Sequence, residues 1–132
     1  MDWGTFIKEI RNLSEIITDK PDIIIGITRG GIVPARLLSA YLKVKNMYCI
    51  SVVKNNNERH IATEITEDIS GKKILLVEDI LETGKSIKAV KTYLEGKGAN
   101  VKTACLYTMP LSEIKPDHYL NEVDSVLEFP WE

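Results

Sequence analysis

The segment Glu78–Ser86 combines acidic, hydroxyl and glycine residues in a pattern suited to chemistry. It follows the apolar run Ile74–Val77, so the two carboxylates of Glu78 and Asp79 are expected at the tip of a buried strand. Carboxylates in such a place are costly unless a cation or a set of hydroxyl groups meets them. The segment therefore predicts a ligand that supplies one or the other.

The second half of this segment predicts an anion site. Thr83, Gly84, Lys85 and Ser86 lead directly into the helical pattern Lys85–Gly96. A helix N-terminus offers free N–H groups and a partial positive charge, and two hydroxyl groups add further donors. Glycine lets the backbone approach a ligand closely. The pattern favours a phosphate monoester.

Two common nucleotide-binding motifs are excluded. A P-loop requires GxxxxGK[ST], and Asp79 stands where the first glycine before Gly84 is needed. Residues 26–31 have the glycine spacing, but Ile32 replaces the lysine. Residues 96–101 lack the third glycine of a dinucleotide fingerprint. The chain is thus predicted to be neither an ordinary NTPase nor a Rossmann dehydrogenase.

The elements that must position these residues alternate between helices and strands. Apolar residues at helical spacing predict a first helix from Trp3 to Ile17, capped by Asp2. Strands are expected at 23–27, 47–53, 73–77 and 101–107, and further helices at 33–42 and 85–96. This order predicts a single α/β domain over residues 1–132, with a parallel sheet flanked by helices and right-handed crossovers.

The remaining segments give weaker patterns. Lys54–His60 is polar and is expected to be an exposed loop, while the alternation in Ile61–Ile69 suits an edge strand. The last 25 residues are expected to form an irregular appendage over one end of the domain. Ligands of open α/β sheets bind beyond the carboxyl ends of the strands, which points to Thr28–Gly31 and Glu78–Ser86.

The bulk composition limits location and partners. The chain has 132 residues, 44% of them hydrophobic, and a formal net charge of −2, so no global positive field recruits nucleic acid. No apolar run approaches the ~20 residues that span a bilayer, and no leader pattern opens the sequence.

Cys49 and Cys105 lie in apolar runs and are expected to be reduced core thiols. His60 and His118 are expected at the surface. We expect a cytoplasmic protein without membrane or nucleic-acid partners.

Three segments together resemble a known family. Residues 74–86 (ILLVEDILETGKS) resemble the signature with which type I phosphoribosyltransferases bind phosphoribosyl pyrophosphate (PRPP). Residues 25–34 (IGITRGGIVP) resemble the pyrophosphate loop of the purine branch. The ending Phe129–Glu132 resembles the C-terminal hood of the small xanthine–guanine (6-oxopurine) enzymes of bacteria and archaea. The resemblance implies the type I phosphoribosyltransferase fold, with a short hood over residues 108–132.

The resemblance also implies a role for each acidic and phosphate-binding position. Glu78 and Asp79 would bind the ribose hydroxyls, with Asp79 near a Mg²⁺ ion. Thr28, Arg29 and Gly30 would bind pyrophosphate, and family members often have a cis peptide just before the Arg29 position. The 5′-phosphate would lie in the loop formed by Thr83, Gly84, Lys85 and Ser86.

The base side of the site departs from the family pattern. Trp131 and Phe129 would bind the base, and Glu82 would accept a proton from it, although the family usually has aspartate there. Met109 stands where purine enzymes generally have a lysine that bonds the exocyclic oxygen. Lys115 could substitute only if its loop folds back.

The implied activity is salvage transfer of ribose 5-phosphate from PRPP to guanine, xanthine or hypoxanthine, with Mg²⁺ as cofactor and a homodimer as the usual assembly. Two alternatives stay open: a sensor of PRPP or nucleotide that performs no turnover, and transfer to another base. Single features also have plain structural explanations. Glu78 and Asp79 could form a solvated strand end, and Trp131 could be a hydrophobic anchor.

Overall fold

A four-stranded parallel sheet forms the centre of the computed structural model, which describes residues 1–132. Its strand order is β2-β1-β5-β7, with β1 at Ile23–Ile27, β2 at Met47–Ile50, β5 at Lys73–Val77 and β7 at Asn100–Ala104. All five residues of β1 are buried, because neighbouring strands flank it and helices cover both faces. The predicted buried parallel sheet is confirmed.

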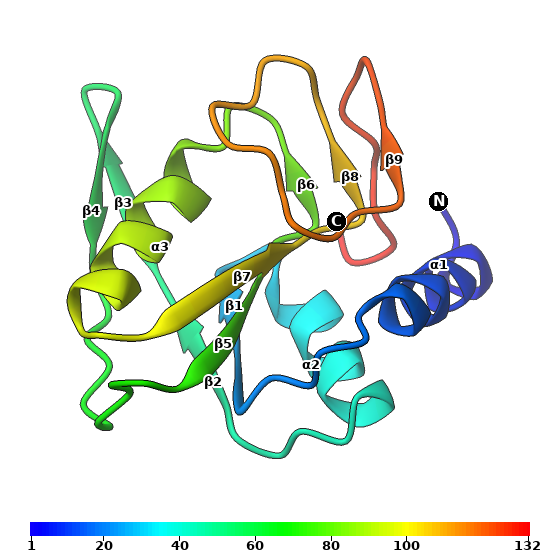
Figure 1. Ribbon diagram of the computed structural model, residues 1–132. Coiled ribbons are helices and arrows are strands. Elements are labelled where there is room, and N and C mark those ends of the chain that lie inside the picture. The colour runs from blue at the N-terminus through cyan, green and yellow to red at the C-terminus, as the bar shows by residue number, and fades with distance from the viewer.

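Helices cover the two faces of the sheet unequally (Figure 1). The helices α1 (Trp3–Ile16) and α2 (Ile32–Tyr41) lie on one face, and α3 (Lys85–Gly96) lies on the other. Side chains alternate along each strand, so Ile24 and Leu75 pack with α1 and α2, whereas Ile25 and Leu76 pack with α3. Two apolar cores therefore hold the sheet in place.

Asp2 caps α1 as the sequence predicts. Its carboxylate accepts a hydrogen bond from the Thr5 N–H at 2.7 Å, and this bond lowers the pKa of Asp2. Phe6, Ile10 and Leu13 recur at helical spacing and are fully buried against the sheet. None of the helices has the length and apolar character needed to cross a bilayer.

The segment after β2 corrects two expectations. The predicted strand 47–53 is interrupted at Ser51, whose N–H binds the Thr63 hydroxyl at 3.1 Å. A hairpin follows, with β3 at Val52–Asn55 and β4 at Glu58–Ile61, so the expected loop 54–60 is mostly paired strand. Asn56 and Asn57 both have positive φ, as a two-residue hairpin turn requires.

The expected edge strand 61–69 is wrong beyond Ile61. Ile65 and Ile69 alternate with polar residues because they anchor an irregular segment in the core beneath α3, not because the segment pairs with another strand. The Ile65 N–H donates to the Tyr93 hydroxyl on α3 at 3.2 Å. Buried residues at even spacing give the same alternation in sequence as a strand, although this segment forms none.

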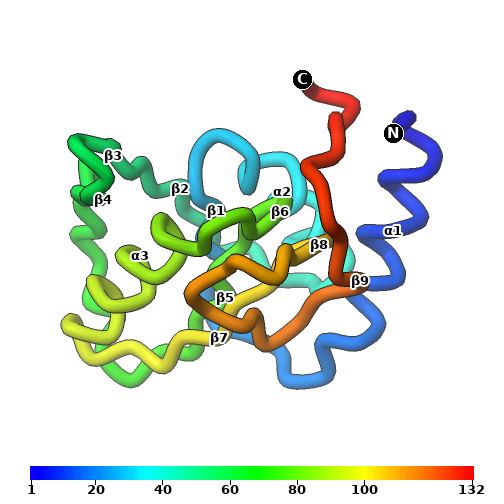
Figure 2. Tube along the Cα trace, turned by 90° about the horizontal axis from the view of Figure 1, so that it is seen from above, coloured from blue at the N-terminus to red at the C-terminus, as the bar shows by residue number.

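The C-terminal segment is more regular than expected. The strands β6 (Ile80–Leu81), β8 (Tyr107–Thr108) and β9 (Asn121–Glu122) form a small parallel sheet above the end of the central one. The predicted strand 101–107 is thus divided between β7 and β8. Figure 2 shows the last residues running beside α1, with the two chain ends close together.

Both cysteines are free thiols, as predicted. Cys105 is buried and Cys49 is half-buried, and burial raises the pKa of each thiol. His60 is exposed and His118 is half-buried. None of these four side chains lines the cavity described next.

Candidate active site

Two carboxylates without a cationic partner stand at the carboxyl end of β5. Asp79 is only 8% exposed and accepts a hydrogen bond from the Ile80 N–H at 2.7 Å, while Glu78 is half-buried. None of the ion pairs in the structure involves either group. Burial raises the pKa of Asp79. The pKa of Glu78 lies well above its usual value, mainly because the group is buried and secondly because of the negative charge of Asp79. These groups are arranged to meet a cation or a hydroxyl-rich ligand.

The loop after β1 faces this acidic tip. The peptide bond between Thr28 and Arg29 is cis, in agreement with the expectation for this position. The Thr28 hydroxyl lies 2.8 Å from that of Ser51, and the Arg29 side chain is exposed. A Cβ atom on Gly30 would overlap the carboxylate of Asp79. The absence of a side chain at position 30 therefore lets the two loops come into contact.

A cavity of about 810 Å³ opens between these two loops and the C-terminal segment. It brings together all three residues of the predicted pyrophosphate loop, the three predicted acids and part of the hood. The lining residues are Thr28, Arg29, Gly30, Glu78, Asp79, Ile80, Glu82, Val126, Trp131 and Glu132. Their carboxylates, backbone groups and aromatic ring suit a ligand with both charged and flat apolar parts.

A smaller cavity of about 170 Å³ adjoins the first. It is lined by the predicted phosphate loop 83–86 and shares Glu78, Ile80 and Glu82 with the larger cavity. Gly84 has a φ of +73° and directly precedes α3, so the loop turns sharply into the helix N-terminus. The size and position of this cavity suit an anion held by the helix N-terminus.

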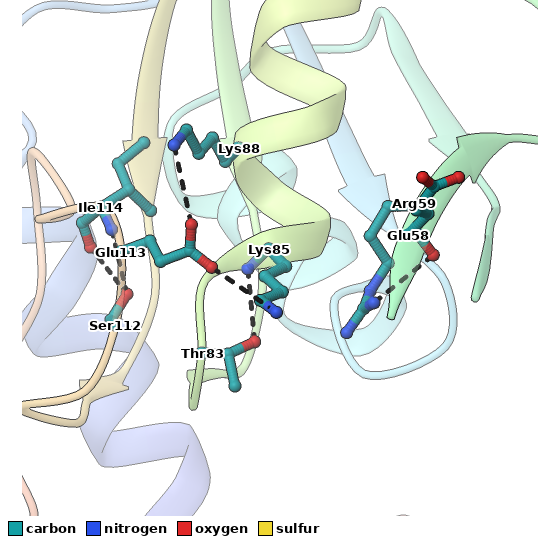
Figure 3. Close-up of polar contacts among 8 residues, drawn as sticks. All are labelled: Glu58, Arg59, Thr83, Lys85, Lys88, Ser112, Glu113 and Ile114. Carbon is teal, nitrogen blue, oxygen red and sulfur yellow. Dashed lines mark hydrogen bonds and ion pairs between the residues drawn. The ribbon is translucent and has the colours of Figure 1, made fainter. Parts of the chain in front are cut away.

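Lys85 is the one cationic residue that lines the smaller cavity. Its side chain is 29% exposed, and its ammonium group lies 4.0 Å from the carboxylate of Glu113 in the hood. Figure 3 shows Lys85 beside Thr83, with Arg59 extending from the hairpin β3–β4 on the other side of the view. The phosphate loop thus carries its own positive charge.

An aromatic stack forms one wall of the larger cavity. Trp131 lies parallel to Phe129, with ring centroids 4.9 Å apart, and meets Phe6 of α1 edge-on at 4.8 Å. Phe129 is 2% exposed and lies between Tyr107 and Trp131, outside the cavity lining. The structure therefore places Trp131 in the cavity lining and Phe129 behind it.

The two other base-side candidates lie away from the cavity lining. Met109 is half-buried at the start of the hood, and its N–H donates to the carbonyl oxygen of Leu81 at 2.9 Å. Lys115 is exposed. Neither side chain lines either of the two cavities.

Three cavity residues escaped the sequence interpretation: Ile80, Val126 and Glu132. Ile80 looks like an ordinary apolar residue, and Val126 is 51% exposed, which only the fold reveals. The charge of Glu132 contributes to the raised pKa of Asp79. The two residues are far apart in sequence, so no local pattern predicts this interaction.

Comparison with known proteins shows which family the chain belongs to. A family model described as the phosphoribosyl transferase domain matches residues 2–132. The chain belongs to the phosphoribosyl transferase domain family. The resemblance of residues 25–34 and 74–86 to this family is thereby confirmed, and so is the fold that it implied.

Several purine enzymes are similar to this family member. It is 30% identical to a hypoxanthine-guanine phosphoribosyltransferase of Lactococcus lactis, over 85% of this chain and 69% of that protein. It is 28% identical to a xanthine-guanine phosphoribosyltransferase of Chromohalobacter salexigens, over 100% of this chain and 82% of that protein. A purine phosphoribosyltransferase from Pyrococcus horikoshii has a similar structure, with a TM-score of 0.93, 33% identity and coverage of 100% of this chain and 92% of that one.

Proposed function

We propose that this protein is a purine phosphoribosyltransferase, which transfers the ribose 5-phosphate of PRPP to a 6-oxopurine and releases pyrophosphate. The observation that carries the proposal is the junction of the two cavities along Glu78, Ile80 and Glu82. The two cavities bring together an anion pocket, paired carboxylates, the loop 28–30 and an aromatic wall, which match the parts of the two substrates. Relatives named as hypoxanthine-guanine and xanthine-guanine enzymes support the choice of base.

The proposed roles follow the positions of the groups. The loop Thr83–Ser86 binds the 5′-phosphate with its backbone N–H groups, hydroxyls and Lys85. Glu78 and Asp79 accept hydrogen bonds from the ribose hydroxyls, which gives polar partners to two carboxylates that have no cationic partner in the protein. Thr28, Arg29 and Gly30 bind the pyrophosphate.

Asp79 also fits a role in binding Mg²⁺. The chain has no cluster of three or more His, Cys, Asp or Glu residues that could hold a metal ion by themselves. Mg²⁺ is commonly bound through one or two carboxylates together with substrate phosphates, and the buried, unpaired Asp79 with its neighbour Glu78 provides such a donor set. When bound, the ion would neutralise charge on the departing pyrophosphate.

The chain's own contribution to the reaction is positioning and charge. Positive charge develops on the sugar as pyrophosphate leaves, and the carboxylates of Glu78 and Asp79 stabilise it while Arg29 stabilises the leaving anion. Glu82 is exposed and lines both cavities, so its carboxylate can accept the proton that the base nitrogen loses.

The base lies against the hood in this proposal. Trp131 gives one flat wall, backed by Phe129, and Ile80 and Val126 supply further apolar surface. Met109 cannot donate the hydrogen bond that a lysine at that position would give to the exocyclic oxygen. Discrimination among bases is therefore weaker than in a lysine-containing enzyme, since such contacts can decide about 10⁴-fold.

The assembly and the cellular location are proposed from what is usual in the family. We expect one domain over residues 1–132 with its hood at 108–132, a homodimer, and a cytoplasmic location for salvage. Gel filtration with light scattering tests the dimer.

A base panel tests the activity. The protein is incubated with PRPP, Mg²⁺ and guanine, xanthine, hypoxanthine or adenine in turn, and pyrophosphate release is followed. Turnover with any of the three 6-oxopurines supports the proposal. Tight binding of PRPP or nucleotide without turnover would instead favour the sensor, which the glutamate at position 82 and the methionine at position 109 make the leading alternative. Turnover with adenine alone would indicate a different base.

A further inference from the structure

The start of the hood is fastened to the back of the phosphate loop. The Glu113 N–H donates to the carbonyl oxygen of Thr83 at 2.7 Å, and the Met109 N–H donates to that of Leu81 at 2.9 Å. Ser112 closes the turn between them, because its hydroxyl donates to the Ile114 carbonyl oxygen at 2.7 Å. The hood and the phosphate loop are thus joined by main-chain hydrogen bonds.

Packing between the same two segments is equally close. A Cβ atom on Gly84 would overlap the Ser112 hydroxyl and would come within 3.0 Å of the Ile114 side chain. The loop therefore has no room to move toward the hood. A shift of Ser112–Ile114 would be transmitted directly to the backbone of Gly84.

The carboxylate of Glu113 adds a charge contact to this junction (Figure 3). One of its oxygens lies 4.0 Å from the ammonium group of Lys85, and the other lies 3.7 Å from that of Lys88. The Glu113 side chain is 40% exposed, so water screens the pair only in part. Two lysines and one glutamate leave a net positive charge beside the anion pocket.

Lys85 needs such a partner to serve the pocket. A lysine side chain is a flexible four-carbon stem with a point charge, and it has many rotamers when nothing holds it. Glu113 restricts that freedom from outside the cavity lining, while Lys88 shares the carboxylate and keeps it from neutralising Lys85 completely. The ammonium group is preorganised for an incoming phosphate.

We propose that Glu113 is a positioning residue for the 5′-phosphate, acting through Lys85, and that it couples the hood to the phosphate loop. This inference rests on the proposed function, because the ligand of the small cavity is assigned there. Glu113 itself does not line that cavity.

The test is the variant Glu113→Gln, which keeps the length of the side chain and the N–H bond to Thr83 but removes the charge. The dissociation constant of ribose 5-phosphate is measured by calorimetry, and KM for PRPP and kcat are measured with the base that turns over. We expect ribose 5-phosphate binding to weaken and KM to rise, each about three- to fivefold, with kcat changed less than twofold. The effect should shrink in 0.5 M salt.

Glu95→Gln is the matched control. It removes the pair of Glu95 and Lys91, which lie 3.8 Å apart on α3, the helix that also carries Lys85 and Lys88. It should leave the dissociation constant of ribose 5-phosphate and KM for PRPP unchanged. A double-mutant cycle identifies the route: in a Lys85→Met background, Glu113→Gln should have no further effect, whereas in a Lys88→Met background it should keep its effect.

The outcomes separate the two proposals. Unchanged or tighter ribose 5-phosphate binding in Glu113→Gln would overturn the role of Glu113 and leave the proposed function intact. Binding that weakens as expected, in a protein that turns over no base, would support Glu113 and contradict the enzymatic proposal. If the wild-type protein does not bind ribose 5-phosphate, the role of Glu113 is wrong, whereas the enzymatic proposal is decided by turnover in the base panel.

Discussion

Gly30 lies so close to Asp79 that the Cβ atom of any other residue at position 30 would overlap the carboxylate. One of these residues belongs to the loop after β1, and the other to the acidic tip of β5. Because β1 and β5 are adjacent parallel strands, their carboxyl ends bring the two loops into contact. The groups proposed to bind pyrophosphate and ribose therefore form a single packed unit.

This contact predicts that Gly30→Ala abolishes most activity. The added methyl group must displace the Asp79 carboxylate or the loop, and overpacking of this kind costs about 1–3 kcal/mol. We expect kcat/KM for PRPP to fall at least tenfold. Gly96→Ala at the end of α3 is the control, because a Cβ atom there meets no atom within 4 Å. Equal activity of the two variants would contradict the packed arrangement.

The acidic tip predicts a stability that depends on pH. The pKa of Glu78 is raised well above its usual value by burial and by Asp79, so the folded protein holds this proton to higher pH than the unfolded chain. The free energy of unfolding should therefore decrease as the pH rises from about 4.5 through the folded-state pKa. In the Glu78→Gln variant, this decrease in the free energy of unfolding at higher pH should be absent. We expect the variant to be more stable than the wild type at pH 8, with the difference shrinking toward pH 4.5, in urea unfolding without ligand.

Glu122→Gln, an exposed position on β9, is the control and should leave the pH profile unchanged. A Glu78→Gln variant that gains nothing at pH 8 would show that this carboxylate is solvated and not strained by burial.

Asp79 and Glu82 should affect different kinetic constants. Asp79→Asn removes a buried charge proposed to bind ribose and Mg²⁺, so we expect KM for PRPP to rise at least tenfold. Glu82→Gln removes the proposed proton acceptor, so we expect kcat to fall about 100-fold with KM for PRPP within about threefold. Steady-state kinetics at saturating base separates the two. The reverse pattern would exchange their assigned roles.

Met109 predicts a gain of function. Met109→Lys supplies an ammonium donor at the start of the hood, and we expect kcat/KM for a 6-oxopurine to rise about tenfold or more. The control is Met109→Leu, which keeps the apolar character and should change little. No gain in the lysine variant would mean that the side chain at position 109 does not reach the base, and Lys115 would be the next position to examine.

Phe6 on α1 should affect base binding from behind the cavity wall. Phe6→Leu removes the edge-on contact with Trp131, and we expect it to cost about 1–2 kcal/mol and to raise KM for the base several-fold more than KM for PRPP. Ile10→Val lies on the same helix in the same core but outside the aromatic stack, so it should destabilise without this selectivity. Parallel changes of both KM values in Phe6→Leu would indicate a merely structural role.

The central elements could be predicted because their signals are local. The helix expected at 85–96 and the strands expected at 23–27 and 73–77 agree with α3, β1 and β5, since uninterrupted apolar runs and glycine stops act within a few residues. The hairpin β3–β4 gives no clear strand pattern because the residues around its turn are polar and most of the hairpin is exposed. Ile61–Ile69 gave a false strand because two buried isoleucines at even spacing do not report hydrogen-bonding partners.

The site could be predicted only where it is contiguous in sequence. The loops 28–30 and 78–86 each carry their pattern within a few residues, and the fold brings both to the cavities. Val126 and Glu132 join the same cavity through the path of an irregular segment, which has no period to interpret. The family resemblance assigns Phe129 to the base, and only the packing shows that it lies behind Trp131.

The contact between α1 and the C-terminal segment has a consequence for biogenesis. During synthesis, Phe6 emerges from the ribosome with the first helix, whereas its aromatic neighbours Phe129 and Trp131 emerge after all strands of the central sheet. Closing a loop of nearly the whole chain delays this contact relative to the local ones. The central sheet and the loop 83–86 can therefore form before the aromatic wall of the larger cavity is complete.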